Sequence, residues 1–217
     1  MSLYYQDDQI ILYHGDSLTE HREWIDADVL VTDPPYGMSY VSNASKFGRT
    51  KPIAGDTDPE LRDRVLETWG NDKPALVFGT WRVTRPQQTR AILVWDKGNS
   101  PGMGDLSLPW GPSWEECYVI GSGFIGRRTG SVIRIDTLSS ASKDRPNHPT
   151  PKPIPLMERL IEKCPPGLLA DPFAGSGSTL VAAKNLGRKI IGVELEEKYC
   201  EIIANRCAQE VLDFGNL

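Results

Sequence analysis

Residues 168–180 have the sequence LLADPFAGSGSTL, and this stretch decides the fold class. A short apolar run ends at Ala170, an acidic residue and a turn of small residues follow, and a helical pattern begins at Thr179. A strand, a glycine turn and a helix in this order are typical of the cofactor loop of an open α/β sheet. Leu180 replaces the third glycine of the dinucleotide fingerprint, and no phosphate-loop Gly-Lys-Ser is present. The loop therefore disfavours a cofactor that is held by its pyrophosphate.

Outward from this loop, short apolar runs rich in β-branched residues alternate with helical patterns. We predict seven strands, at residues 10–13, 29–32, 75–78, 92–95, 117–120, 168–170 and 190–193. We predict helices at residues 17–24, 59–69, 155–162, 179–186 and 197–211. The alternation indicates an α/β fold with a mostly parallel sheet that is covered on both faces. Segments 38–55, 98–116 and 137–153 are predicted loops, and residues 121–136 form either a small β-hairpin or a minimal insert.

The composition predicts one globular domain over residues 1–217. The hydrophobic content is 39%, and no apolar run approaches the roughly 18 residues of a membrane span. The amino-terminal residues lack the pattern of a secretory signal, so we expect a cytoplasmic protein with no membrane association. The four cysteines have no metal-ligand spacing, so no metal site is expected. The net charge of −5 argues against a general polyanion binder, so any nucleic-acid site must be local.

A second motif, Asp33-Pro34-Pro35-Tyr36, follows the predicted strand at residues 29–32. The two prolines stiffen the turn, so the Asp33 side chain and the Pro34 carbonyl become two hydrogen-bond acceptors in a nearly fixed relation. Such a pair suits an amino group on a heteroaromatic ring, because two N–H donors held in place leave the nitrogen lone pair exposed to a methyl donor. Tyr36 can stack on the base. The alternative is a turn that merely ends a strand.

The glycine loop suits a cofactor with a positively charged amino-acid group. Gly175 and Gly177 let a ligand approach the backbone closely, and Asp171 matches an ammonium better than it matches a phosphate. S-adenosylmethionine fits this description. Glu194, 23 positions after Asp171, is the candidate for the ribose hydroxyls; alternatively it is a solvated acid that opens the next helix. The predicted cofactor residues of the loop itself are Asp171, Phe173, Gly175, Gly177, Ser178 and Thr179.

With DPPY before the cofactor loop, the chain resembles the β class of amino methyltransferases that act on DNA. The resemblance implies a Rossmann-like, S-adenosylmethionine-dependent methyltransferase fold with circularly permuted motifs. Its sheet would have seven strands, of which the one before Gly121 would be antiparallel. Asp16 would bind the cofactor's adenine, although Asp16 with the following Ser17-x-x-Glu20 is equally a helix cap. His148 and Lys152 would shape the methionine end; alternatively, the prolines around them form a rigid connector.

DNA contacts are expected from two basic groups. The resemblance implies that a target-recognition insert would occupy residues 124–147, which is short and leaves room for a homodimer or partner that supplies further contacts. Either basic group could also be an ordinary solvated surface. The insert contains Arg127, Arg128, Arg134, Lys143 and Arg145, and the loop after Tyr36 contains Lys46, Arg49 and Lys51.

We therefore predict a stand-alone modification enzyme that methylates N6 of adenine in double-stranded DNA. The target base would be flipped out of the duplex, and the methyl transfer would be direct. N4 of cytosine is the alternative target, since its amino group has the same geometry, although aspartate at the first motif position leans towards adenine in the family. A non-catalytic DNA-binding protein with the same fold, and an RNA or protein amide methyltransferase, are the remaining alternatives.

Overall fold

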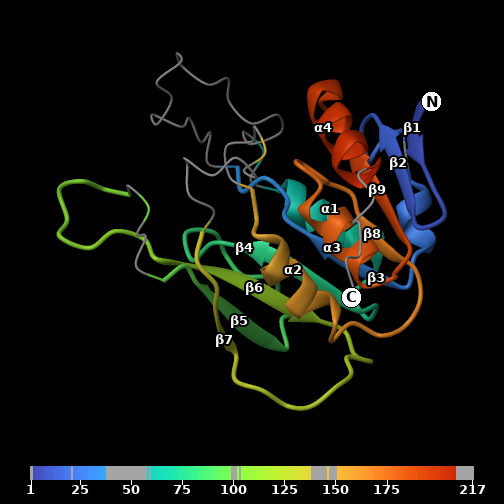
Figure 1. Cartoon of the computed structure of the whole chain (residues 1–217). Helices are drawn as coiled ribbons and strands as arrows, with labels where there is room; N and C mark the ends of the chain where they lie inside the picture. The colour runs from blue at the N-terminus through green and yellow to red at the C-terminus, as the bar shows by residue number, and fades with distance from the viewer. Residues whose placement is uncertain are drawn as a thin grey trace, which may run out of the picture.

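A computed structural model of the chain describes residues 2–20, 22–37, 58, 60–98, 102, 104–137, 146 and 151–208. The described residues form one mixed sheet with helices on both faces (Figure 1). The strands are β1 (Ser2–Gln6), β2 (Ile10–His14), β3 (Val29–Thr32), β4 (Ala75–Gly79), β5 (Ala91–Asp96), β6 (Trp114–Ile120), β7 (Val132–Arg134), β8 (Leu169–Asp171) and β9 (Ile190–Glu194). The helices are the 3-10 helix η1 (Glu23–Asp26), α1 (Leu61–Trp69), α2 (Ile154–Ile161), α3 (Ser178–Asn185) and α4 (Glu197–Ala208).

The strand order is β1-β2-β9-β8-β3-β4-β6-β5-β7. Strands β2, β9, β8, β3 and β4 pair in parallel, whereas β6 is antiparallel to both of its neighbours, as predicted for the strand before Gly121. The α/β fold class and all seven predicted strands are confirmed. The predicted count was wrong, because β1 adds a second antiparallel strand and β7 a further parallel one.

Both additional strands lie at the edges of the sheet, and this explains why the sequence pattern missed them. No residue of β1 is fully buried, and β7 has only three residues with exposed side chains at both ends. An edge strand of this kind lacks the apolar alternation on which the prediction depended. Residues 121–136 do not form the expected β-hairpin, since β7 pairs with β5. The alternative, a minimal insert, stays a prediction.

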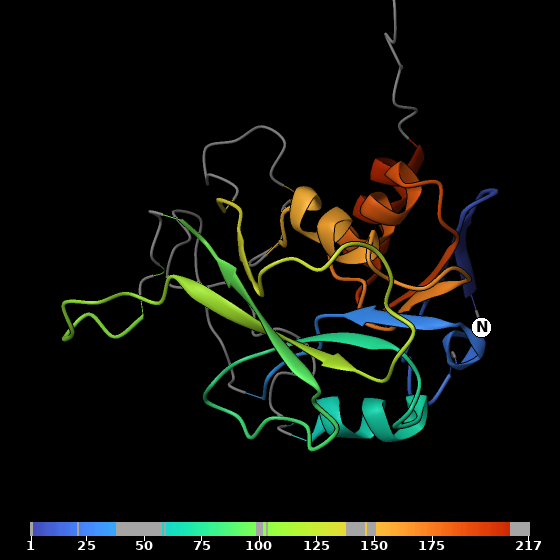
Figure 2. The same ribbon diagram turned by 90° about the horizontal axis from the view of Figure 1, so that it is seen from below.

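The two faces of the sheet carry separate hydrophobic clusters. Helices α2, α3 and α4 cover one face, where Leu156, Leu180 and Ile203 pack with strand residues of the core. Helix α1 and η1 cover the other face, where Trp24 and Trp69 are stacked with ring centroids 6.1 Å apart. Figure 2 shows α1 on one side of the sheet and the orange and red helices on the other. No helix among the described residues is long and apolar enough to cross a membrane.

The helix predicted at residues 17–24 is wrong. The described part of this segment forms turns followed by η1. Asp16 Oδ1 accepts hydrogen bonds from the amides of Leu18 at 2.8 Å and Thr19 at 3.3 Å, and the indole of Trp24 donates to the Ser17 carbonyl at 2.8 Å. These bonds satisfy the polar groups locally, so a continuous helix is not required. The remaining predicted helices are present, within one or two residues at their described ends.

Candidate active site

The two sequence motifs meet at the carboxyl ends of neighbouring strands. Strands β3 and β8 pair in parallel, so Asp33 and the glycine loop leave the sheet at the same edge. The Thr32 hydroxyl, one residue before Asp33, donates a 2.7 Å hydrogen bond to Asp171 Oδ1. Both groups are buried. This bond joins the turn that holds the predicted acceptors to the loop that is expected to hold the cofactor, where open α/β sheets bind their ligands.

Each carboxylate oxygen of Asp33 has a partner. The Tyr36 hydroxyl donates to Oδ1 at 2.7 Å, and the Lys152 ammonium, which comes from the segment just before α2, contacts Oδ2. Burial, together with the Asp33 and Glu115 charges, raises the pKa of Tyr36 well above its ordinary value. The hydroxyl therefore remains a donor. The two prolines between Asp33 and Tyr36 restrict the backbone of this segment, in which the two side chains three positions apart are in contact.

Two residues of this site, Glu115 and Lys97, were not predicted from the sequence. Glu115 lies at the start of β6, and its Oε2 is 3.2 Å from the Lys152 Nζ. Lys97 follows β5 and donates to Glu115 Oε1 at 2.5 Å. Although burial raises the pKa of Glu115, the charges of Lys152 and Lys97 more than offset this and lower it. The sequence prediction missed them because it placed Glu115 in the loop at residues 98–116, whereas β6 begins at Trp114.

In the glycine loop, Gly175 and Gly177 have φ values of 54° and 81°, which side chains other than glycine rarely adopt. The Gly175 amide donates to Glu194 Oε2 at 2.8 Å, and the Glu196 amide donates to Glu194 Oε1 at 2.8 Å. Burial raises the pKa of Glu194 to about 7, with the hydrogen bonds acting against it. Glu194 is therefore not a solvated acid. It is buried at the end of β9 and bonded to the loop.

Asp171 is turned into the protein rather than towards solvent, with only 2% of its surface exposed. Besides Thr32, the amide of Phe173 donates to Asp171 Oδ1 at 3.1 Å. Burial raises the pKa of Asp171 to about 6, while the hydrogen bonds from Thr179, Thr32 and Phe173 lower it. These contacts assign Asp171 a structural part in shaping the loop. Its predicted contact with an ammonium stays a prediction.

Asp16 follows β2, the strand that pairs with β9 so that His14 lies opposite Glu194. Because the Gly15 amide donates to the Glu194 carbonyl at 3.0 Å, Asp16 and Glu194 belong to the same corner of the sheet edge. The cap that the sequence suggested is present, since Asp16 Oδ1 accepts the Leu18 and Thr19 amides. Its contact with the cofactor stays a prediction.

The residues present fit an adenosyl amino acid. Two carboxylates, Asp16 and Glu194, lie at the ends of adjacent strands and can accept from amino and hydroxyl groups. Ser178 Oγ, at the start of α3, is buried and has no hydrogen-bond partner among the described residues. Such a group would normally be satisfied, and a bound cofactor is one source of a partner.

The structure places the described basic residues that were predicted to contact DNA at two opposite edges of the sheet. Arg134 ends β7 beside Asp96, at the sheet edge where Asp33 lies. Arg127 is on the opposite edge, because its carbonyl accepts from Lys163 in the turn that precedes β8. Arg127 and its neighbour Arg128 are thus not brought together with the DPPY turn. Several predicted residues lie outside the described part of the chain, namely Lys46, Arg49, Lys51, Lys143, Arg145 and His148.

Comparison with known proteins places this geometry in a family. The family model of N6/N4 DNA methylases matches residues 67–205. Type II methyltransferase M2.LlaDCHI of Lactococcus lactis subsp. cremoris is 46% identical over 244 aligned positions, covering 94% of this chain and 91% of that protein.

Solved structures agree on the fold. The M1.HpyAVI complex with S-adenosylmethionine has a TM-score of 0.63 at 21% identity, covering 92% of this chain and 100% of that one. The cytosine-N4-specific PvuII DNA methyltransferase has a TM-score of 0.69 at 14% identity, covering 97% and 90%. From the family match, the full-length relative and the shared edge of the two motifs, the chain belongs to the N6-adenine/N4-cytosine family of DNA methyltransferases, and S-adenosylmethionine is its methyl donor.

Proposed function

We propose that this enzyme methylates N6 of adenine in double-stranded DNA, on a base flipped out of the duplex. The observation that carries the proposal is the Thr32–Asp171 hydrogen bond of 2.7 Å, which holds the DPPY turn against the glycine loop. A target amino group at Asp33 would then be adjacent to the donor's methyl group. Close approach of aligned reactants supplies a large part of the rate enhancement in such a transfer.

The chain's own residues would orient the amino group and accept its proton. Asp33 and the Pro34 carbonyl accept its two N–H donors, which leaves the nitrogen lone pair pointing away from both. S-adenosylmethionine supplies a methyl group that its sulfonium already activates. Since the methylated nitrogen must lose a proton, the Asp33 carboxylate is the nearest base. Tyr36 would stack on the flipped base and offset part of the few kcal/mol that flipping requires.

We prefer adenine because the motif begins with aspartate. In the family that the chain resembles, aspartate at this position favours adenine. N4 of cytosine is the second candidate, because the PvuII methyltransferase, which shares the fold, is cytosine-specific. Purified enzyme should be incubated with unmodified genomic DNA, and the nucleosides quantified by mass spectrometry. N6-methyladenine is the expected product, and N4-methylcytosine alone would replace adenine with cytosine in this proposal.

The role of Asp33 is tested with the Asp33→Ala variant. Methylated product should fall below detection, while binding of S-adenosylmethionine, measured by calorimetry, should stay within about three-fold of the wild type because the glycine loop is intact. Turnover at the wild-type rate would contradict the role. A variant that retained donor binding but no longer bound DNA would instead indicate that Asp33 serves mainly in base binding.

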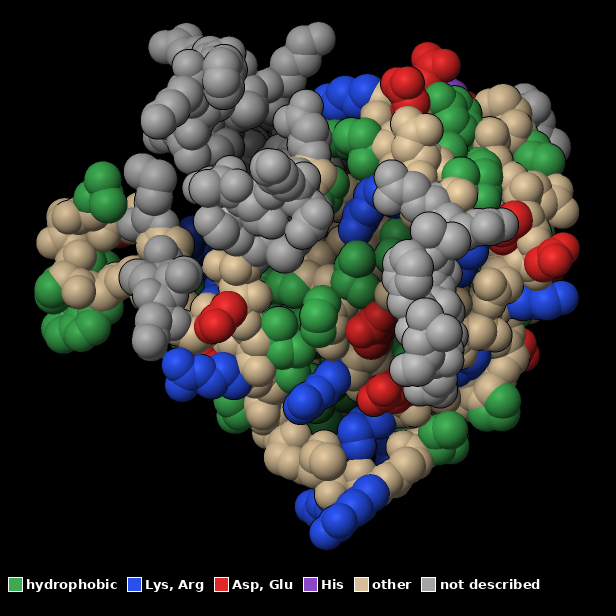
Figure 3. All heavy atoms as spheres, viewed as in Figure 1, with side chains coloured by type: hydrophobic (Ala, Val, Ile, Leu, Met, Phe, Trp, Pro, Cys, Tyr) green, Lys and Arg blue, Asp and Glu red, His purple; other side chains and the backbone are tan. Residues whose placement is uncertain are grey.

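We further propose that the segment around residues 124–147 reads the target sequence and that a second copy of the chain adds contacts. Exposed apolar side chains support the dimer. Leu106 and Trp110, between β5 and β6, are 77% and 79% exposed, and Val132 on the edge strand β7 is 62% exposed. In Figure 3 hydrophobic side chains gather on the arm between β5 and β6, at the left. Light scattering at several concentrations should give twice the chain mass of 24.1 kDa.

A further inference from the structure

Four charged side chains of alternating sign form a chain at the carboxyl edge of the sheet. Lys97 follows β5, Glu115 begins β6, Lys152 precedes α2 and Asp33 follows β3. Their exposed side-chain fractions are 17%, 22%, 8% and 28%. Each member contacts the next one, from Lys97 through Glu115 and Lys152 to Asp33. The chain thus ends on the carboxylate that is proposed to bind the target amino group.

Lys152 links Glu115 to Asp33, and only 8% of its side chain is exposed. A buried ammonium needs oppositely charged partners, because it loses its hydration. The carboxylates of Asp33 and Glu115 are its two ion-pair partners, and the Phe78 ring centroid lies 4.8 Å from Nζ. Asp33 is in the segment that must receive a base, whereas Glu115 belongs to β6 and is paired with Trp95 of β5. Glu115 is therefore the rigid anchor of this ammonium.

We propose that Glu115 is a positioning residue for methyl transfer, because it fixes the Lys152 ammonium, which in turn fixes the Asp33 carboxylate beside the donor site. This inference rests on the proposed role of Asp33. With Oδ2 held by Lys152, Oδ1 is directed to the side of Tyr36, where the stacked base would lie. Lys97 fixes Glu115 in the same way, because it donates a hydrogen bond to the other carboxylate oxygen of Glu115.

Removal of the Glu115 charge should loosen the hold of Lys152 on Asp33. Burial lowers the pKa of Lys152, but Asp33 and Glu115 more than offset this and hold it above its ordinary value, so the ammonium keeps its charge. Without the Glu115 carboxylate the ammonium loses one of its two ion-pair partners and is no longer fixed beside Asp33.

The test is a comparison of kcat between Glu115→Gln and the wild type at saturating DNA and S-adenosylmethionine. We expect kcat to be lower by about ten-fold or more, because Asp33 is no longer held in place. The KM of DNA should stay within about two-fold, so that the loss falls on kcat and not on KM.

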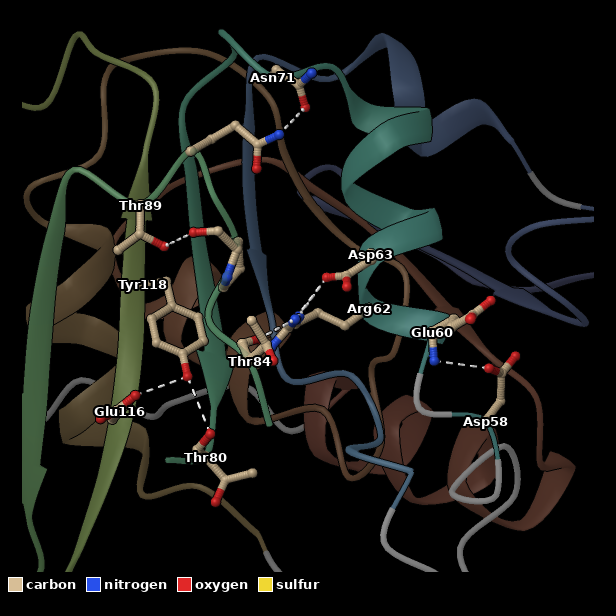
Figure 4. A network of polar contacts seen from close by, with 12 residues as sticks. Asp58, Glu60, Arg62, Asp63, Asn71, Thr80, Thr84, Thr89, Glu116 and Tyr118 are labelled. Atoms are coloured by element: carbon tan, nitrogen blue, oxygen red, sulfur yellow. Dashed lines mark hydrogen bonds and ion pairs between the residues drawn. The ribbon is translucent and has the colours of Figure 1, made fainter. Parts of the chain in front are cut away.

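Glu116→Gln is the matched control. Glu116 is the next residue of β6 and faces the other side of the sheet, where Arg85 donates to it at 2.6 Å and 3.0 Å and the Tyr118 hydroxyl at 2.8 Å. Figure 4 shows Glu116 bonded to Tyr118, which also reaches Thr80. Assayed well below its melting temperature, this variant should keep the wild-type kcat.

A wild-type kcat in Glu115→Gln would overturn the inference. If Asp33→Ala is inactive in the same assay, the proposed function survives that result; if Asp33→Ala is active, the proposed function itself fails. Should Glu115→Gln not fold, Glu115→Asp decides, since its shorter carboxylate reaches Lys152 less well. It should have a lower kcat than the wild type, and a kcat equal to that of the wild type would overturn the inference.

Discussion

At the residue scale, Tyr36 combines two contacts that substitution can separate. Its ring is proposed to stack on the base, and its hydroxyl donates to Asp33 at 2.7 Å. Tyr36→Phe keeps the ring, so kcat/KM on duplex DNA should stay within about three-fold of the wild type. Tyr36→Ala loses the ring and should lower kcat/KM by about ten-fold to about a hundred-fold, since stacking contributes about 1–3 kcal/mol per base. Equal losses in the two variants would show that the hydroxyl, and not the stacking, is what matters.

Glu194 gives the folded enzyme a pH-dependent stability. Because burial raises its pKa to about 7, the folded state binds its proton more tightly than the unfolded state does. The corresponding stability is present below about pH 4.5 and is lost as the pH rises through about 7, amounting to roughly 3 kcal/mol at most.

The Glu194→Gln variant tests this contribution. Glutamine resembles the protonated acid, so the fall in the free energy of unfolding between about pH 5 and about pH 8 should be smaller in the variant than in the wild type. Urea unfolding at several pH values, without cofactor, measures the difference. The same variant should bind S-adenosylmethionine about ten-fold more weakly if Glu194 holds the ribose. Parallel unfolding curves would show that the carboxyl group titrates normally.

At the scale of elements, Gly79 at the end of β4 leaves the space that the Tyr118 ring of β6 occupies. A Cβ at Gly79 would lie 2.3 Å from the Tyr118 ring on β6, and Tyr118 is held by Glu116 and the Thr80 carbonyl (Figure 4). Gly79→Ala should therefore lower the free energy of unfolding by about 1–3 kcal/mol, because the fixed ring cannot move aside. Gly130→Ala is the control, since nothing lies within 4 Å of its added Cβ. Thermal denaturation of both variants measures this, and equal melting temperatures would refute the packing argument.

At the scale of the whole molecule, the placement of arginines predicts which edge meets DNA. Arg134 is on the edge that carries Asp33, and Arg127 is on the opposite edge. Arg134→Gln should weaken DNA binding and reduce the slope of log K against log salt by about one, because one phosphate contact is lost. Arg127→Gln should leave both unchanged. Fluorescence anisotropy at several salt concentrations measures the slopes, and the reverse pattern would place the DNA on the other edge.

The sequence by itself determined the central sheet and the two motifs. The seven predicted strands are present because each has a local run of apolar residues, and the reversed strand before Gly121 is where the resemblance placed it. The glycine turn after Asp171 was equally readable, since it depends on residues adjacent in the chain. Edge strands β1 and β7 and the turn at Asp16 were missed or misjudged, because burial is slight there or a side-chain acceptor replaces the helix.

Only the tertiary structure decided how the site is assembled. Thr32 and Asp171 are 139 positions apart and Asp33 and Lys152 are 119 apart, so no local pattern could pair them. Their contacts follow from the strand order, which brings β3 beside β8 and the start of β6 beside the end of β5. A sequence fixes periodicity over a few residues through local sterics and burial, whereas the partner of a charged group is fixed by which strands become neighbours. Glu115 and Lys97 are part of the site because β5 and β6 are neighbours in the sheet.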